Sequence, residues 1–193
     1  MKTLALNILD IVQNSLRAEA DEISISIREL EGSDIYVIEV KDNGNGIPPE
    51  ILVSVKDPFV TSRTRRKMGL GLPLLDHHAT IAGGTMEISS EVGKGTTVTA
   101  SFQNSHIDRQ PLGDIAGVLR LLIASNPRVN FIFKHTTDFG EYRFSSRETK
   151  EYLDIETFNS SDLLYDIGLM INGNLIDINV SGIDHTVLNQ DYI

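Results

Sequence analysis

The chain has 193 residues, 40% of them hydrophobic and 23% charged, which is enough apolar material to bury a core without metals or disulfides. Cysteine is absent, which excludes thiol catalysis, cysteine metal clusters and disulfides and favours an intracellular setting. The formal net charge of -10 argues against a nucleic-acid partner, because a nucleic-acid surface must offer clustered cations to phosphate.

Residues 4–18 predict a helix, since they contain no Gly or Pro and carry apolar side chains at helical spacing. Ile8, Ile11, Val12 and Ser15 fall on one face. Polar residues recur every three or four positions along the same helix and therefore form a single stripe. The stripe consists of Asn7, Asp10, Asn14, Arg17 and Asp21.

The next segments, residues 23–27 and 35–41, predict a β-hairpin. Isoleucine alternates with serine in the first segment, the second is rich in β-branched residues, and residues 31–34 form the turn. The hairpin ends in Asp42-Asn43-Gly44-Asn45-Gly46, which is too rich in Gly and Asn to continue a strand. A loop is therefore expected there, with a short helix near Pro49.

Residues 61–67 are polar and basic, and predict a flexible segment before a second helix. That helix opens with Gly-Leu-Gly-Leu at 69–72, runs to Ile81 and stops at Gly83-Gly84. Strands over 86–90 and 98–102, joined by a tight turn at 93–95, complete a first unit.

The stretch 103–111 is polar, lacks periodicity and ends in a proline, so it is the predicted linker between two domains. The second domain, residues 112–193, is expected to contain a helix over 115–123, a hairpin of 129–134 with 141–145, a helix over 162–172 and a strand over 175–180. The predicted fold class is α+β. A two-layer sandwich over residues 1–102, with helices on one face of a mixed, largely antiparallel sheet, precedes a smaller α+β domain of unknown role.

Several stretches of the first unit, in this order, resemble the GHKL-type ATP-binding domain shared by DNA gyrase, the large heat-shock chaperone, histidine kinases and mismatch-repair ATPases. They are residues 10–18 (DIVQNSLRA), 42–47 (DNGNGI), 57–59 (DPF), 69–72 (GLGL) and 93–96 (GKGT). The resemblance covers about residues 4–102. It implies ATP and magnesium as ligands.

In this resemblance Asn14 coordinates magnesium, and its amide oxygen is a hard neutral ligand suited to an ion that keeps most of its waters. Asp42 accepts the adenine amino group, which selects against guanine because guanine would present a carbonyl oxygen to the carboxylate. Gly44 and Gly46 let the backbone approach the base, and Thr96 supports adenine recognition.

The resemblance also implies a phosphate end. Gly69 and Gly71 free backbone amides at a helix start, Arg17 is directed at the phosphates, and residues 63–67 form a lid. Asp10 is the implied catalytic residue, standing where gyrase, chaperone and mismatch-repair relatives carry a glutamate that polarises water. The full implied ATP-binding set is Asn14, Arg17, Asp42, Gly44, Gly46, Ile47, Thr61, Ser62, Arg63, Lys67, Gly69, Leu70, Gly71, Leu72 and Thr96.

Each stretch taken alone has a structural alternative. The Asp42 loop could be an ordinary turn, Gly69-Leu70-Gly71 a helix cap, residues 63–67 a solvated loop and Asp10 a helix-surface carboxylate. Asp138-Phe139-Gly140 copies the magnesium triplet of protein kinases, but no His-Arg-Asp loop precedes it and a hairpin turn is expected there.

Three functions stay open at this stage. The first is a magnesium-dependent regulatory ATPase or switch, the second a protein kinase acting on serine or histidine of a separate partner, and the third a nucleotide-binding regulator without catalysis. We expect a free-standing ATP-binding domain without a phosphoacceptor domain, because the magnesium helix begins almost at Met1. We further expect a cytoplasmic protein with a protein partner and no membrane partner, and leave a homodimer open.

Overall fold

The computed structural model describes residues 2–52 and 71–183. The strands are β1 (Glu22–Leu30), β2 (Ile35–Asp42), β3 (Met86–Glu91), β4 (Gly95–Gln103), β5 (Asn130–Thr137) and β6 (Gly140–Ser145). The helices are α1 (Leu4–Arg17), α2 (Pro49–Leu52), α3 (Gly71–Ile81), α4 (Ile115–Ser125), α5 (Ser146–Leu153) and α6 (Ser161–Asp177).

The strands form one six-stranded sheet in the order β3-β4-β2-β1-β5-β6. All neighbouring strands are antiparallel except β1 and β5, which run parallel. The last residue of β2, Asp42, lies opposite Thr96 of β4 on one side and opposite Ile23 of β1 on the other. The register therefore brings two predicted site residues, Asp42 and Thr96, to the same end of the sheet.

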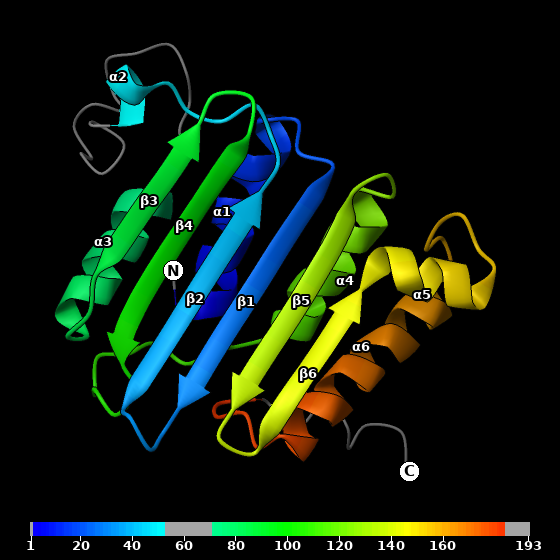
Figure 1. The fold of residues 1–193 in the computed structure, drawn as a ribbon. Coiled ribbons are helices and arrows are strands. Elements are labelled where there is room, and N and C mark those ends of the chain that lie inside the picture. The colour runs from blue at the N-terminus through cyan, green and yellow to red at the C-terminus, as the bar shows by residue number, and fades with distance from the viewer. Residues whose placement is uncertain (1, 53–70, 184–193) are drawn as a thin grey trace.

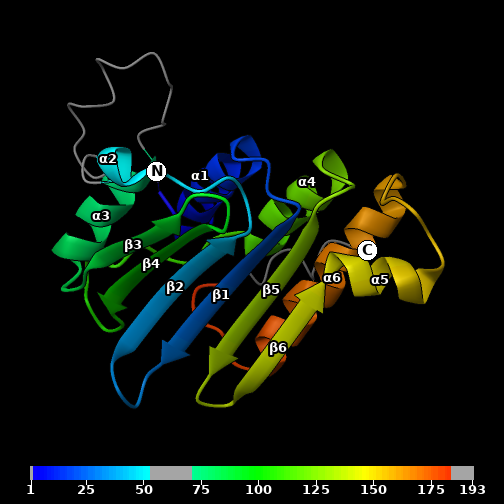
Figure 2. The same ribbon diagram turned by 45° about the horizontal axis from the view of Figure 1, so that its top comes forward.

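Helices α1, α3, α4 and α6 cover one face of the sheet (Figures 1 and 2). The covered face is apolar because alternate strand residues point to it, among them Ile25 of β1, Ile38 of β2 and Phe133 of β5. Except for Val37, the described buried hydrophobic side chains form one core cluster between this face and the helices. These features confirm the predicted α+β class, with helices on one face of a mixed, largely antiparallel sheet.

The sheet continues across the predicted linker. Residues 103–111 connect β4 to α4, and β5, which follows them in the chain, pairs with β1 over eight positions from Glu22↔Asn130 to Glu29↔Thr137. The core cluster likewise includes side chains from both sides of the linker, such as Ile25 and Phe131. The division of the chain into domains 1–102 and 112–193 stays a prediction about folding units.

The predicted strand over 175–180 is wrong, because α6 continues as a helix to Asp177. Ile167, Ile171 and Leu175 are buried at a spacing of four residues, and this packing favours the helix. The prediction that Asp138-Phe139-Gly140 is a turn is confirmed, since it joins β5 to β6. Among the described helices, none combines the length and apolar character needed to cross a membrane.

Candidate functional site

A cavity of about 450 Å³ opens where the C-terminal half of α1 meets the ends of β2 and β4 and the start of α3. The residues that line it are Ile11, Asn14, Ser15, Arg17, Ala18, Asp42, Ile47, Leu72, Thr96 and Val98. Five of these ten residues are polar, but most of the surface that lines the cavity is apolar. This composition is typical of small-molecule sites that hold a flat apolar group and orient it with a few hydrogen bonds.

The carboxylate of Asp42 is the most constrained polar group of the cavity. Its Oδ2 accepts a hydrogen bond from Ser15 Oγ at 2.6 Å, and its Oδ1 accepts from the backbone amides of Gly44 at 2.9 Å and Thr96 at 3.2 Å. Only 7% of Asp42 is exposed. Three donors converging on one buried carboxylate fix its orientation.

The loop after β2 is packed closely against its neighbours, which explains its glycines. A Cβ at Gly44 would lie 2.6 Å from the carbonyl oxygen of Ala18. Gly46 has a positive φ of 69°, and a Cβ there would lie 2.2 Å from the carbonyl oxygen of Glu91. The loop therefore holds its backbone between α1 and the β3–β4 turn, and no larger residue fits at either position.

Asn14 and Arg17 lie one turn apart on α1 and both line the cavity. The guanidinium of Arg17 donates from Nη1 to Asn14 Oδ1 at 2.9 Å. The amide oxygen of Asn14 is a hard neutral ligand of the kind that binds magnesium alongside water and phosphate oxygens. No group of three or more His, Asp or Glu side chains that could hold a metal ion occurs in the part of the chain that the structure describes.

Asp10 lies beside the start of α3 and is not among the described residues that line the cavity. A Cβ at Gly71, the first residue of α3, would lie 2.8 Å from Asp10 Cβ and 3.1 Å from Asp10 Oδ2. The Asp10 carboxylate is therefore in contact with a helix N-terminus. Helix N-termini attract anions through their free amides and the helix dipole.

The structure brings a subset of the predicted site residues together around the cavity. That subset is Asn14, Arg17, Asp42, Ile47, Leu72 and Thr96. Gly44 donates to Asp42, Gly46 and Gly71 directly precede Ile47 and Leu72 in the chain, and Asp10 contacts Gly71. The predicted residues Thr61, Ser62, Arg63, Lys67, Gly69 and Leu70 lie outside the described part of the chain.

Sequence reasoning did not include Ser15 and Ser90 in the site. Ser15 contacts Asp42 directly, and Ser90 Oγ accepts from the amide of Ile47 at 2.8 Å and lies 2.9 Å from Thr96 Oγ1. Ser15 had a readable signal, because it is a polar residue on the apolar face of α1 next to Asn14. Ser90 had none, because its role follows from the pairing of β3 with β4.

Comparison with known families gives a match over this part of the chain. The family described as "Histidine kinase-, DNA gyrase B-, and HSP90-like ATPase" matches residues 2–106. The chain belongs to this family. The match spans α1, the Asp42 loop, α3 and β4, so the whole cavity lies inside this histidine kinase-like ATPase domain.

Among curated proteins, the histidine kinase-like ATPase domain is similar to two bacterial sensors. The chain is 40% identical over 99 residues to the sensor protein SrrB of Staphylococcus aureus, which covers 46% of this chain and 16% of SrrB. It is 40% identical over 79 residues to the sensor kinase CckA of Brucella abortus, which covers 40% of this chain and 8% of CckA. The chain thus spans only a small part of these relatives.

Among solved structures, the fold is similar to the N-terminal domain of a DNA repair protein. The TM-score is 0.50 at 19% sequence identity, and the match covers 75% of this chain and 52% of that chain. At this identity the likeness concerns the fold alone.

Proposed function

We propose that this histidine kinase-like ATPase domain binds ATP with magnesium and works as a regulatory ATPase or switch. The observation that carries the proposal is the Asp42 carboxylate, buried at the wall of the cavity and held by Ser15, Gly44 and Thr96. A carboxylate has about four acceptor positions, of which these three bonds use three, so one position on Oδ2 is available to the amino group of adenine. Guanine would present a carbonyl oxygen there and lose that bond.

The end of the site formed by α1 and the start of α3 supports phosphate binding. In our proposal Asn14 ligates the magnesium ion, Arg17 approaches the phosphates, and Gly71 frees amides at the start of α3. When bound, magnesium would neutralise phosphate charge. Asp10, at the α3 start, is the proposed group that polarises the attacking water, and its short side chain favours slow hydrolysis.

The remaining predicted residues complete the proposal. Gly44 and Gly46 allow the backbone to approach the base, and Ile47, Leu72 and Thr96 contribute to its pocket. The proposed lid is residues 63–67, and Thr61, Ser62, Gly69 and Leu70 complete the proposed ATP-binding set, all of them outside the described part of the chain. Residues 112–193 would form the surface that a protein partner binds. The proposed location of the protein is the cytoplasm.

A second candidate function is phosphotransfer to a separate protein. The observation that favours it is the 40% identity to a sensor kinase, CckA, and to the sensor protein SrrB. Incubation of the protein with labelled ATP and candidate partners would then move the terminal phosphate onto a partner protein. Nucleotide turnover without any labelled protein would favour the ATPase or switch instead.

The test of the proposed function is calorimetric titration with ATP and GTP, with and without magnesium. We expect ATP to bind more tightly than GTP, magnesium to strengthen binding, and Asp42→Asn to weaken ATP binding by about tenfold or more, because an amide group would face donors. Asp34→Asn is the matched control, since Asp34 also accepts backbone and side-chain donors but lies in the turn at the other end of β2. Equal binding of ATP and GTP, or no binding of either, would sink the proposal.

A further inference from the structure

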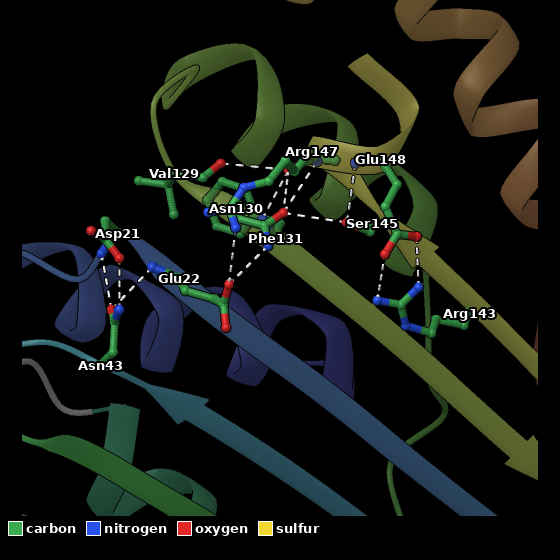
Figure 3. A network of polar contacts seen from close by, with 11 residues as sticks. Asp21, Glu22, Asn43, Val129, Asn130, Phe131, Arg143, Ser145, Arg147 and Glu148 are labelled. Carbon is green, nitrogen blue, oxygen red and sulfur yellow. Dashed lines mark hydrogen bonds and ion pairs between the residues drawn. The ribbon is translucent and has the colours of Figure 1, made fainter. Parts of the chain in front are cut away.

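Two asparagines, Asn43 and Asn130, join residues 21–22 at the start of β1 to the loop after β2 and to the start of β5 (Figure 3). The first is Asn43, which directly follows Asp42. Its side-chain Oδ1 accepts from the amides of Asp21 at 3.1 Å and Glu22 at 3.0 Å, and its Nδ2 donates to Asp21 Oδ1 at 2.6 Å. One side chain therefore ties the loop after β2 to the start of β1.

The second is Asn130, the first residue of β5 and only 5% exposed. Its backbone N–H donates to the backbone carbonyl of Asp21 at 2.8 Å, and its side-chain Nδ2 donates to Glu22 Oε2 at 3.0 Å. Its Oδ1 accepts from the amide of Arg147 at 3.1 Å and lies 3.4 Å from Ser146 Oγ. Asn130 thus bridges residues 21–22 and the first turn of α5.

The two bridges share residues 21–22, so they form one network. Arg147 adds a contact of 3.6 Å from Nη1 to Glu22 Oε2. The loop after β2 is also held against the end of α1. The backbone N–H of Asn45 donates to the carbonyl of Ala18 at 2.7 Å, and Gly44 packs on Ala18 as well. A shift of residues 21–22 would therefore move the loop after β2, which carries the Gly44 amide that donates to Asp42.

We propose that Asn43 and Asn130 are positioning residues for the nucleotide-base pocket. Together they hold residues 21–22 between the Asp42 loop and the N-terminus of α5. Asn130 and α5 lie outside residues 2–106, the part of the chain that matches the ATPase family. The base pocket of this protein therefore depends on a segment beyond its ATPase domain. This inference rests on the proposed function, and it adds to it the residues that set nucleotide affinity.

The experiment measures ATP affinity by calorimetry on the full chain. Asn130→Asp keeps the acceptor for Arg147 but replaces the donor to Glu22 with a second carboxylate oxygen, so we expect ATP affinity to fall about three- to tenfold. Adding Glu22→Gln lets the amide of the new side chain at position 22 donate to the carboxylate at position 130, which is the reverse of the original bond. The double variant should recover most of the lost ATP affinity. A merely structural role for Asn130 would not produce this recovery of affinity.

Asn43→Ala tests the exposed end of the network without touching a buried residue, and should also weaken ATP binding about three- to tenfold. It decides the question if Asn130→Asp fails to fold. Arg143→Ala is the control, because Arg143 pairs with Glu148 on the first turn of α5 through bonds of 2.6 and 2.9 Å that do not involve residues 21–22. Its ATP affinity should stay within about twofold.

The outcomes separate the inference from the proposed function. If the wild-type protein binds ATP and Asn43→Ala leaves the affinity unchanged, the positioning role is overturned and the proposed function stands. The same holds if a folded Asn130→Asp binds ATP as the wild type does. If the wild type itself binds no ATP, both fall together.

Discussion

The hydroxyl of Ser15 is the shortest contact to the buried Asp42 carboxylate, at 2.6 Å. Ser15→Ala removes this donor and leaves a buried charged group with one hydrogen bond fewer, which costs about 1–3 kcal/mol. We expect the free energy of unfolding to fall by that amount in urea titrations, and ATP affinity to fall with it. Ser24→Ala, in β1, should change the unfolding free energy by less than about 0.5 kcal/mol. Equal effects of the two substitutions would contradict the role of Ser15.

Glu29 belongs to a second buried polar group, at the end of the sheet away from Asp42. Burial would raise the pKa of Glu29, but the His135 imidazole, with Nε2 at 3.5 Å from Oε2, and the amide of Ser181, at 3.2 Å, together outweigh burial and hold the pKa below its ordinary value. Both contacts favour the charged form of the carboxylate.

This environment predicts an acid-labile contribution to stability. A carboxyl group with a depressed pKa in the folded state stabilises the protein above its unfolded pKa of 4.5, and this contribution is lost as pH falls through the lower folded value. The free energy of unfolding should therefore decrease below pH 4.5, and the decrease should be less steep in Glu29→Gln. Urea titrations between about pH 3 and 5.5 check this. An unchanged slope in the variant would show that other carboxyl groups dominate.

Two helix glycines differ in how much space surrounds them: Gly71 in α3 is tightly packed, and Gly173 in α6 is not. Gly71 starts α3 against Asp10, and a Cβ there would lie 2.8 Å from Asp10 Cβ. Gly173 lies inside α6, where a Cβ would meet nothing within 4 Å. The first position is thus a close approach between α1 and α3, whereas the second is a helix position that glycine weakens.

Alanine substitutions at the two sites should have opposite signs. Gly71→Ala overpacks the α1–α3 contact and should lower the free energy of unfolding by about 1–3 kcal/mol. Gly173→Ala should raise it by up to about 1 kcal/mol, because alanine loses less backbone entropy in a helix. Chemical denaturation of both variants measures the difference. Stabilisation by Gly71→Ala would mean that α3 does not pack tightly on Asp10.

At the scale of the whole molecule, the pairing of β1 with β5 ties the ATPase domain to the rest of the chain. The parallel ladder spans eight residue pairs, and the buried side chains on both sides of residues 103–111 belong to one core cluster. Separating the two parts would expose buried side chains such as Phe131 and Phe133 to water. Their burial favours unfolding as one unit.

We therefore expect a single thermal transition, with equal calorimetric and van't Hoff enthalpies, in scanning calorimetry of the whole chain. Saturating ATP should shift the entire transition upward, because ligand binding stabilises whatever unfolds with the site. Two resolved transitions, of which ATP shifts only one, would favour instead the two folding units expected from the sequence.

Features with local causes can be predicted from the amino-acid sequence. The apolar periodicity of residues 4–18 predicted α1, the glycines after Asp42 predicted the loop, and the ordered motifs identified the ATPase family before any contact was known. Local patterns were misleading at two helices. The polar and mostly exposed α5 was missed, and the end of α6 resembled a strand.

Which segments pack or pair with one another becomes visible in the folded chain. Helical hydrogen bonds join residues four apart and leave a local signature, whereas a strand chooses its neighbour through contacts between distant residues. The pairing of β5 with β1, the bond from Ser15 to Asp42 and the bridge made by Asn130 all join residues far apart in the chain. They depend on how the helices and the sheet pack together, and no local pattern in the sequence records that packing.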